Sequence, residues 1–208
     1  MAREARRADG ERTRERLLEV ALPLFAERGF TGTSVRAIAG EAGANVAAIA
    51  YYFGDKQGLY DAVVVRLHDD LEADFPADLL DGVAPADLVE TLAERAWAFA
   101  LSHRDHIRLQ VRHVLDTGRQ PDVVVQQRSE PLLARAEQLV GLFRPETPAV
   151  QRRMLVLALM HATVRLSLES RDQLSTMLGG VDDLDGHIVV FLAGLLRREL
   201  GIPKEGGS

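Results

Sequence analysis

Several side chains between residues 33 and 56 can donate hydrogen bonds, but none of them is combined with a nucleophile or a general base as catalysis requires. No serine, carboxylate pair or glycine-rich phosphate loop of the chain stands in a catalytic context, so an enzyme is not expected. Hydroxyl, amide, guanidinium and ammonium groups can instead bind the phosphates and base edges of DNA. We expect phosphate contacts from the hydroxyls and the ammonium of this stretch, namely Thr33, Ser34, Tyr51, Tyr52 and Lys56.

Base contacts are expected from a second group of side chains in the same stretch. Asn45, Val46, Ala47 and Ala48 would face the bases, with the small apolar side chains against thymine methyl groups. Arg36 could reach either a guanine edge or a phosphate. Because so few of these side chains form hydrogen bonds, part of the specificity is expected to come from DNA shape.

Two short helices at a steep angle would position these side chains. Ser34 is suited to cap the first helix, because its hydroxyl can accept a free backbone N–H of the opening turn. Gly43 stands where a left-handed residue would end that helix, and Asn45 would cap the second. Ile49 and Phe53 would point inward. This order predicts a helix-turn-helix, and an ordinary packed helix corner is the alternative. For Tyr52, core packing is as good an interpretation as phosphate contact.

The residues around these two helices resemble the TetR family of bacterial transcriptional regulators over residues 12–62. The matching segments are Leu24–Phe30, Thr33–Ala39, Ala42–Gly43 and Tyr52–Leu59. The second helix is most similar to a branch of the family whose recognition helix reads Asn-x-Ala-Ala-Ile, which here begins at Asn45. Ala50 lacks the polar side chain that is usual at its position in the family.

The resemblance implies an all-α protein with two domains. A helix-turn-helix DNA-binding domain would occupy residues 1–56, and a helical effector-binding and dimerisation domain would occupy residues 57–208. Members of the family dimerise through a four-helix bundle of two C-terminal helices per chain. The resemblance therefore implies a homodimeric repressor that a small-molecule effector releases from a palindromic double-stranded DNA operator. A constitutive or structural DNA-binding protein without an effector is the alternative.

Polar side chains inside otherwise apolar helices are the candidates for effector contacts. They are Arg108, Arg112, His113, His161 and Arg165. A place on the surface or in an interface is the alternative for each of them. A metal or catalytic site built on the three histidines between residues 103 and 113 is a weaker hypothesis, because their spacing is not that of a recognised metal site. We expect neither a cofactor nor a metal.

Composition and charge favour a protein of the cytoplasm. The chain has 208 residues, no cysteine and a net charge of −6. Residues 1–60 carry nine basic and eight acidic side chains, whereas residues 61–208 carry sixteen and twenty-three, so the acidic excess lies away from the candidate DNA-binding stretch. No apolar run approaches the roughly 20 residues of a bilayer span, and no signal peptide opens the sequence, so we expect no membrane partner.

The remaining helices are predicted from apolar periodicity and from helix-ending residues. We expect helices over residues 11–28, 55–75, 85–99, 105–116, 121–143, 183–200, one from Pro148 and a short one from Asp172, with bends at Pro23 and Pro131 and a linker over residues 78–85. Met154–Met160 and Ile188–Leu196 are apolar on every face, so one side of each is expected to meet a partner. A core within one chain is the alternative.

Overall fold

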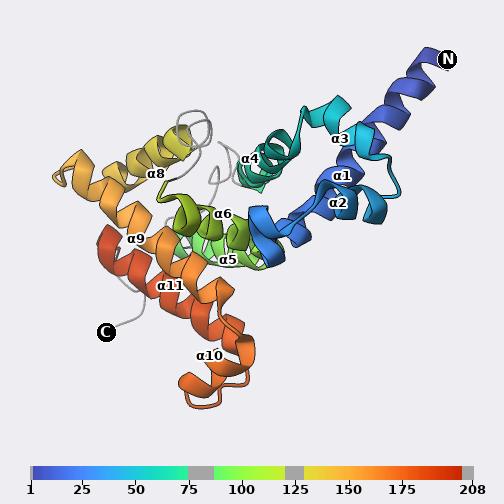
Figure 1. Ribbon diagram of the computed structural model, residues 1–208. Helices are drawn as coiled ribbons and strands as arrows, with labels where there is room; N and C mark the ends of the chain where they lie inside the picture. Colours follow the sequence, from blue (N-terminus) through green and yellow to red (C-terminus); the bar gives the residue numbers. More distant parts are fainter. Residues whose placement is uncertain (1, 75–86, 120–128, 203–208) are drawn as a thin grey trace. The chain divides into compact units, whose positions relative to one another are not determined.

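The computed structural model describes residues 2–74, 87–119 and 129–202, and every regular element in these ranges is an α-helix. The all-α prediction is therefore confirmed. The helices in chain order are α1 (Ala2–Gly32), α2 (Val35–Glu41), α3 (Val46–Phe53), α4 (Lys56–Asp74), α5 (Leu88–Ser102), α6 (Arg104–Thr117), α8 (Glu130–Phe143), α9 (Ala149–Leu168), α10 (Arg171–Met177) and α11 (Leu184–Leu200) (Figure 1). None of these helices is both long enough and apolar enough to cross a membrane.

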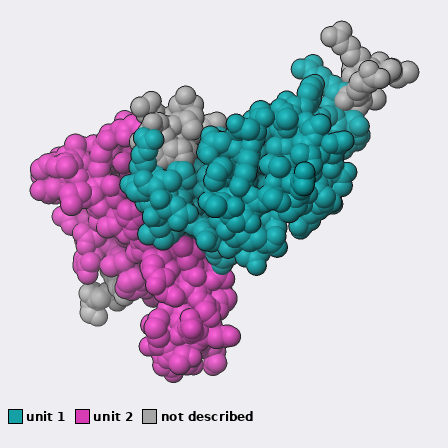
Figure 2. Space-filling view, viewed as in Figure 1, with its two compact units in different colours: residues 1–69, 105–124 teal, residues 70–104, 125–208 magenta. Residues whose placement is uncertain are grey.

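The chain divides into two compact units, each with its own core (Figure 2). Unit 1 comprises residues 1–69 and 105–124, and unit 2 comprises residues 70–104 and 125–208. The functional boundary predicted at residue 56 stays a prediction, but packing divides the chain elsewhere. Most of α4 and nearly all of α6 belong with the N-terminal helices, because their apolar side chains complete the same core.

The core of unit 1 brings together apolar side chains from five helices. Leu17 and Phe25 of α1, Ile49 of α3, Leu59 of α4 and Leu109 of α6 are almost completely buried. Phe25, Phe30 and Tyr60 form an aromatic cluster, in which the Tyr60 ring stands edge-on to both phenylalanines with centroids 5.1 and 5.2 Å away. Edge-to-face pairs of this kind add to the stabilisation that burial alone provides.

Unit 2 is built around α5 and α11, which pack along each other, with α9 against them and α8 against α9. Its core includes Val89, Ala93 and Trp97 of α5 together with Ile188 and Leu192 of α11. These α5 positions are spaced by four residues, so they form one helical stripe. Leu88 and Phe99 of the same helix are also buried, whereas Leu92 and Ala96 are half-buried.

Several helix boundaries differ from the predictions for local reasons. Pro23 lies inside α1, and the only residue of that helix with non-helical backbone angles is Gly29, at φ 73° and ψ 176°. Pro131 is the second residue of α8, which begins at Glu130, and in this first turn its missing N–H costs nothing. The predicted linker over residues 78–85 and the first part of the 121–143 helix lie outside the described residues.

Candidate nucleic-acid interface

Three predicted turn residues fix the geometry of α2 and α3. The Ser34 hydroxyl accepts the Ala37 N–H at 3.1 Å, and the Asn45 side-chain oxygen accepts the Ala47 N–H at 2.9 Å, so both N-caps are confirmed. Gly43 has a positive φ of 64°, which a side chain would disfavour. Arg16 of α1 also donates to the Ala42 carbonyl oxygen at 3.2 Å and ties the first helix to this turn.

Packing decides which face of α3 remains exposed. Ile38, Ala39 and Ile49 are buried between α1, α2 and α3, and Phe53 is half-buried against them. The opposite face of α3 reaches the surface, where Val46 is 41% and Tyr51 is 81% exposed. An exposed helix whose partners lie on its other side has the form of a recognition helix in a helix-turn-helix.

The predicted base-reading residues lie on or beside this surface. Arg36, Asn45, Val46 and Ala47 are exposed, and Ala48 is half-buried. The caps occupy the acceptor atoms of Ser34 and Asn45, so the Ser34 hydroxyl hydrogen and the Asn45 amide N–H groups remain to donate. Donors are the groups that phosphate oxygens and the acceptor edges of purines require.

Thr33 does not lie with the other predicted phosphate contacts. Its side chain is 2% exposed, and its hydroxyl is within hydrogen-bond distance of the carbonyl oxygens of Gly29, at 2.8 Å, and Leu24, at 3.0 Å. The hydroxyl therefore closes the end of α1, where Gly29 has broken the regular helix. The sequence places Thr33 beside the exposed Ser34, and that adjacency conceals the difference in their burial.

Lys56 and Tyr52 are each held in place by a neighbouring side chain. The Lys56 ammonium lies 4.3 Å from the centre of the Phe30 ring, a cation–π contact that leaves the residue half-buried. Tyr52 is half-buried, and its ring stands edge-on to Tyr51 with centroids 4.9 Å apart. A Cβ atom on Gly10 would lie 3.1 Å from the Tyr52 hydroxyl, so the absence of a side chain at Gly10 allows α1 to approach α3.

The N-terminal part of α1 is the feature that sequence reasoning missed. Helix α1 starts at Ala2, well before the predicted Glu11, and Gly10 and Arg14 bring it against α3. The Arg14 guanidinium lies 5.4 Å from the centre of the Phe53 ring. The spacing of Gly10 and Arg14, one helical turn apart, was the available signal for this contact.

The effector candidates on α6 are engaged within unit 1. Arg112 donates to the Glu27 carbonyl oxygen at 2.9 Å, and its guanidinium lies where a Cβ on Gly29 would be. The Nδ1 atom of His113 lies 3.1 Å from the Tyr60 hydroxyl. Arg108 is exposed and pairs with Asp105 at 2.8 Å. The contacts of Arg112 and His113 join α6 to α1 and α4, whereas the pair of Arg108 lies within α6. An effector role for the three residues stays a prediction.

Burial sets the protonation of the Tyr60–His113 pair. Burial, followed by the nearby Asp116 and Asp61 carboxylates, raises the pKa of Tyr60 to about 12. Burial also lowers the pKa of His113, although Asp61 and Asp116 oppose that shift. At neutral pH the imidazole is therefore neutral, and the tautomer of its ring decides which partner donates in the hydrogen bond between Nδ1 and the Tyr60 hydroxyl.

The other two effector candidates, His161 and Arg165, are exposed on α9 of unit 2, where Arg165 pairs with Glu169. The histidines considered as metal ligands fall in both units, with His103 in unit 2 and His106 and His113 in unit 1. Within the described ranges, no group of three or more His, Cys, Asp or Glu side chains is arranged to hold a metal ion.

Comparisons with known proteins agree with this geometry. A sequence profile of the bacterial regulatory proteins of the tetR family matches residues 17–63. The chain is 28% identical over 153 residues to the HTH-type transcriptional repressor NicS of Pseudomonas putida, covering 72% of this chain and 68% of NicS. It is 46% identical over 57 residues to the probable HTH-type transcriptional regulator YttP of Bacillus subtilis, covering 27% of this chain and 28% of YttP.

The fold is also found in solved structures. A TetR family transcription regulator from Marinobacter aquaeolei VT8 superposes with a TM-score of 0.70 at 19% identity, covering 93% of this chain and 97% of that one. The structural likeness extends over both units, whereas the family profile is confined to the N-terminal helices. Residues 17–63 therefore match the N-terminal domain of the bacterial regulatory proteins of the tetR family, within a chain that has the same fold as this solved structure.

Proposed function

We propose that this protein is a transcriptional repressor that binds a palindromic operator as a homodimer and is released by a small-molecule effector. The observation that carries the DNA-binding part is the exposed outer face of α3, held by two capped turns and flanked by the donors of Ser34 and Asn45. Relatives with this domain are described as transcriptional regulators, and NicS as a repressor.

The exposed side chains divide into two roles on DNA. Ser34, Tyr51, Tyr52 and Lys56 would bind phosphates, because each offers a hydroxyl or an ammonium and none of them can distinguish the bases. Asn45 and the small side chains Val46, Ala47 and Ala48 would face base edges and thymine methyl groups. Arg36 is exposed on α2 and would reach a guanine edge or a phosphate. We leave Thr33 out of this surface because its hydroxyl is buried.

Homodimerisation is proposed through the exposed apolar side chains of α9 and α11. Val150, Met154 and Met160 of α9 are 64%, 64% and 42% exposed, and Val190 and Phe191 of α11 are 71% and 54% exposed. Apolar side chains gathered on two helices of one unit favour an interface with a second copy, because water is excluded from both copies at once. A two-fold dimer of this kind presents two recognition helices to a palindrome.

An effector would act by favouring a state of the dimer whose recognition helices no longer match the operator. The proposed effector contacts are Arg108, Arg112 and His113 on α6 and His161 and Arg165 on α9. The contacts of α6 with the DNA-binding helices support this proposal, since a displacement of α6 would move the groups that hold Tyr60 and Glu27. A constitutive DNA-binding protein is the second candidate, and the absence of any effector response would favour it.

Selection of bound DNA from a random pool tests the central proposal. The purified protein is expected to enrich a palindromic consensus, and a double variant, Arg36→Ala with Tyr51→Ala, is expected to lose it. Leu115→Ala is the matched control, because Leu115 is 79% exposed on α6 of the same unit. Enrichment without a consensus would identify a non-specific DNA binder, and no enrichment at low salt would refute DNA binding.

The proposed dimer surface has its own test. Phe191→Glu is expected to halve the mass in solution and to weaken operator binding, because a carboxylate would be buried against a second copy. Leu142→Glu is the matched control, since Leu142 is 78% exposed on α8 of the same unit. If the mass changed in the control and not in Phe191→Glu, the interface would have to include α8 instead.

A further inference from the structure

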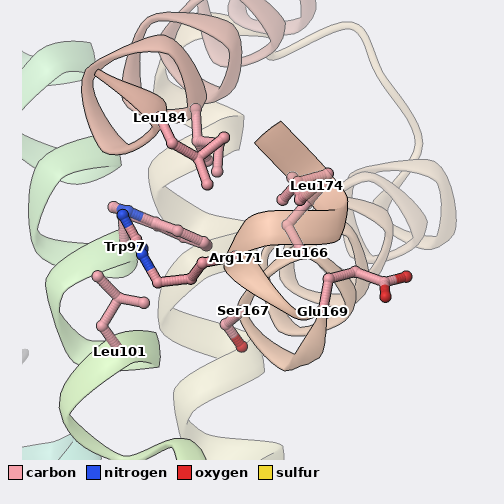
Figure 3. Close-up of a pocket in the computed structure, with 9 residues that line it drawn as sticks. Trp97, Leu101, Leu166, Ser167, Glu169, Arg171, Leu174 and Leu184 are labelled. Atoms are coloured by element: carbon pink, nitrogen blue, oxygen red, sulfur yellow. The ribbon is translucent and has the colours of Figure 1, made fainter. Parts of the chain in front are cut away.

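A small, partly open cavity lies in unit 2 where α5, α9, α10 and α11 meet (Figure 3). Its volume is about 10 Å³, which is room for about one water molecule. Six large apolar side chains line it, namely Trp97, Leu101, Leu166, Leu174, Leu184 and Ile188. The polar lining comes from Ser167, Glu169 and Arg171, at the end of α9 and the start of α10.

A single carboxylate holds the two sides of this cavity together. Both terminal nitrogens of Arg171 donate to Asp185, each at 2.8 Å, and the Trp97 indole N–H donates to the same carboxylate at 2.9 Å. The hydrogen bond from Arg171 is the main cause that lowers the pKa of Asp185, and the Trp97 N–H acts in the same direction. Asp185 is therefore a negative charge beside the cavity, bonded to two of the lining residues, Trp97 and Arg171.

Helix α10 is attached to the unit by few contacts. It has only seven residues, and Leu174 is its one buried side chain. Gly179 and Gly180 follow it with positive φ values of 89° and 80°, so the chain turns at residues that have wide conformational freedom. The Arg171 side chain is 47% exposed, which allows its guanidinium to move into water when its partner is taken by another group.

We propose that Trp97, Asp185 and the cavity beneath α10 form a binding site for a small apolar organic cation. The ammonium of the ligand replaces Arg171 on the Asp185 carboxylate, and its apolar body lies among the leucines as α10 moves outward. The Trp97 indole keeps its hydrogen bond to Asp185 and supplies an aromatic surface, to which cations are attracted. A cavity of about 10 Å³ is too small for an organic molecule, so binding requires the outward movement of α10.

The charges of the site favour a cation over an anion. An anionic ligand that paired with Arg171 would stand beside the Asp185 carboxylate, whose other hydrogen-bond partner within the described ranges is the Trp97 N–H. A cation satisfies Asp185 directly and sends Arg171 into solvent, where its charge is readily hydrated. Glu169 also lines the cavity, but its carboxylate pairs with Arg165 and points away from Trp97, so Asp185 is the carboxylate that decides the preference (Figure 3).

Trp97 reports on the site directly, because it is the only tryptophan of the chain. The intact protein is titrated with 3-phenylpropylamine, 3-phenylpropanoate and 3-phenylpropanol, which share one apolar body and differ in charge. The amine is expected to change the Trp97 fluorescence in a saturable manner, and the carboxylate and the alcohol are expected to bind at least tenfold more weakly. Preferential binding of the carboxylate, or no saturable change with any of the three, would overturn the proposal.

Two substitutions separate ligand binding from a structural role of the same ion pair. Asp185→Asn is expected to weaken binding of the amine at least tenfold, because it removes the charge. Arg171→Ala is expected to strengthen binding severalfold, because it removes the competing cation. A purely structural pair would change affinity in the same direction in both variants, and that result would refute the site. Arg198→Ala, which removes a 71% exposed charge of α11, is the control.

The site goes beyond the proposed DNA-binding function, and its test does not depend on that function. Fluorescence of Trp97 reads ligand binding in unit 2, whereas DNA binding is read on unit 1. If the amine binds and the operator affinity is unchanged, the site stands and the effector acts elsewhere. If the operator affinity falls in parallel with saturation of Trp97, this site is the effector site.

Discussion

Different kinds of contact stabilise each of the two units from within. In unit 1 the core is closed by apolar and aromatic side chains, and the caps of α2 and α3 are hydrogen bonds between residues two or three positions apart. In unit 2 the helices are joined by charged and polar side chains from distant parts of the sequence. Glu90 pairs with Arg197, and Trp97 donates to Asp185, over separations of 107 and 88 residues.

Further charged contacts between helices of unit 2 involve α8, α9 and the end of α11. Glu137 of α8 accepts from both Arg152 and Arg153 of α9, and Arg144 donates to the Glu199 and Arg198 carbonyl oxygens at the end of α11. The partly buried pairs do not add much net stability, because taking charges out of water offsets most of their attraction. They determine which helices pack together, since an alternative arrangement would leave a charge unpaired. Unit 1 also has distant polar contacts, such as those of Arg112 with Glu27 and of Tyr60 with His113, but ion pairs between helices are a feature of unit 2 in particular.

The largest expected effect is a loss of stability in unit 1 that leaves the stability of unit 2 unchanged. Phe25→Ala removes a fully buried ring from the aromatic cluster with Phe30 and Tyr60 and is expected to destabilise unit 1 by about 3–5 kcal/mol. Urea unfolding is followed by circular dichroism for both units and by Trp97 fluorescence for unit 2. The dichroism midpoint is expected to fall while the fluorescence midpoint stays.

A matched control shows whether that loss belongs to burial. Leu115→Ala truncates an exposed side chain of α6 in the same unit, and it is expected to change the stability by less than about 0.5 kcal/mol. An equal fall of the fluorescence midpoint in Phe25→Ala would show that the two units unfold together. The different contacts of the two units would then not give them separate stabilities.

The next effect concerns the exposed surface of unit 1. Arg36→Ala is expected to weaken binding to the selected operator by about 1–3 kcal/mol, because a guanidinium that contacts a guanine edge or a phosphate is lost. Affinity is measured over a range of salt concentrations for the operator and for one altered at each position in turn. Loss of discrimination at one base pair indicates a base contact, and a uniform loss with a shallower salt slope indicates a phosphate contact.

A double-mutant cycle in unit 2 measures its distant ion pairs. The hydrogen bonds between Glu90 and Arg197 lower the pKa of Glu90, and Arg197 is only 16% exposed. Each single variant, Glu90→Gln and Arg197→Met, is expected to cost about 1–2 kcal/mol in the midpoint followed by Trp97. The double variant is expected to cost less than the sum of the two. Additive losses would mean that this pair does not couple α5 to α11.

The exposed pair between Arg198 and Glu199 on α11 is the comparison for that cycle. Their side chains are 71% and 38% exposed, so Arg198→Ala is expected to change stability by less than about 0.5 kcal/mol. If the coupling energy between Glu90 and Arg197 were also below about 0.5 kcal/mol, this pair would stabilise the protein no more than an exposed surface pair does. The distinction between surface pairs and the pairs that join helices would then be lost.

Sequence reasoning predicted the features of unit 1 that depend on short-range physics. The caps at Ser34 and Asn45, the turn at Gly43 and the burial of Ile49 follow from residue type and helical period, and all are present. The burial of Thr33 could not be predicted, because it depends on Gly29 leaving the helix and turning its carbonyl oxygen toward the hydroxyl. Residue type alone places a threonine at that position equally well on the surface.

The contacts of unit 2 were beyond the sequence for a different reason. Helical periodicity finds the apolar stripe of a helix, but it does not say which charged residue pairs with which over a hundred positions. Neither the Glu90–Arg197 pair nor the three-way contact of Trp97, Asp185 and Arg171 has a local signal. Likewise, the packing of α6 with unit 1 depends on Leu109 and His113, whose spacing fits a helix in either unit.

The smallest expected effect concerns His113 of α6, whose pKa is lowered by burial. Because burial lowers the pKa of His113, the unfolded chain takes up a proton near pH 6.5 while the folded protein does so only at a lower pH. The contribution of His113 to the free energy of unfolding of unit 1 is therefore expected to be complete above pH 6.5 and to fall as the pH drops below it.

His113→Gln keeps a hydrogen-bonding group beside Tyr60 and removes this titration. Urea midpoints at pH 7.5 and 5.5 are expected to converge more in this variant than in the parent. Since the chain has six histidines, only the difference between the two proteins isolates His113, and equal pH dependence would show that its protonation is not linked to folding.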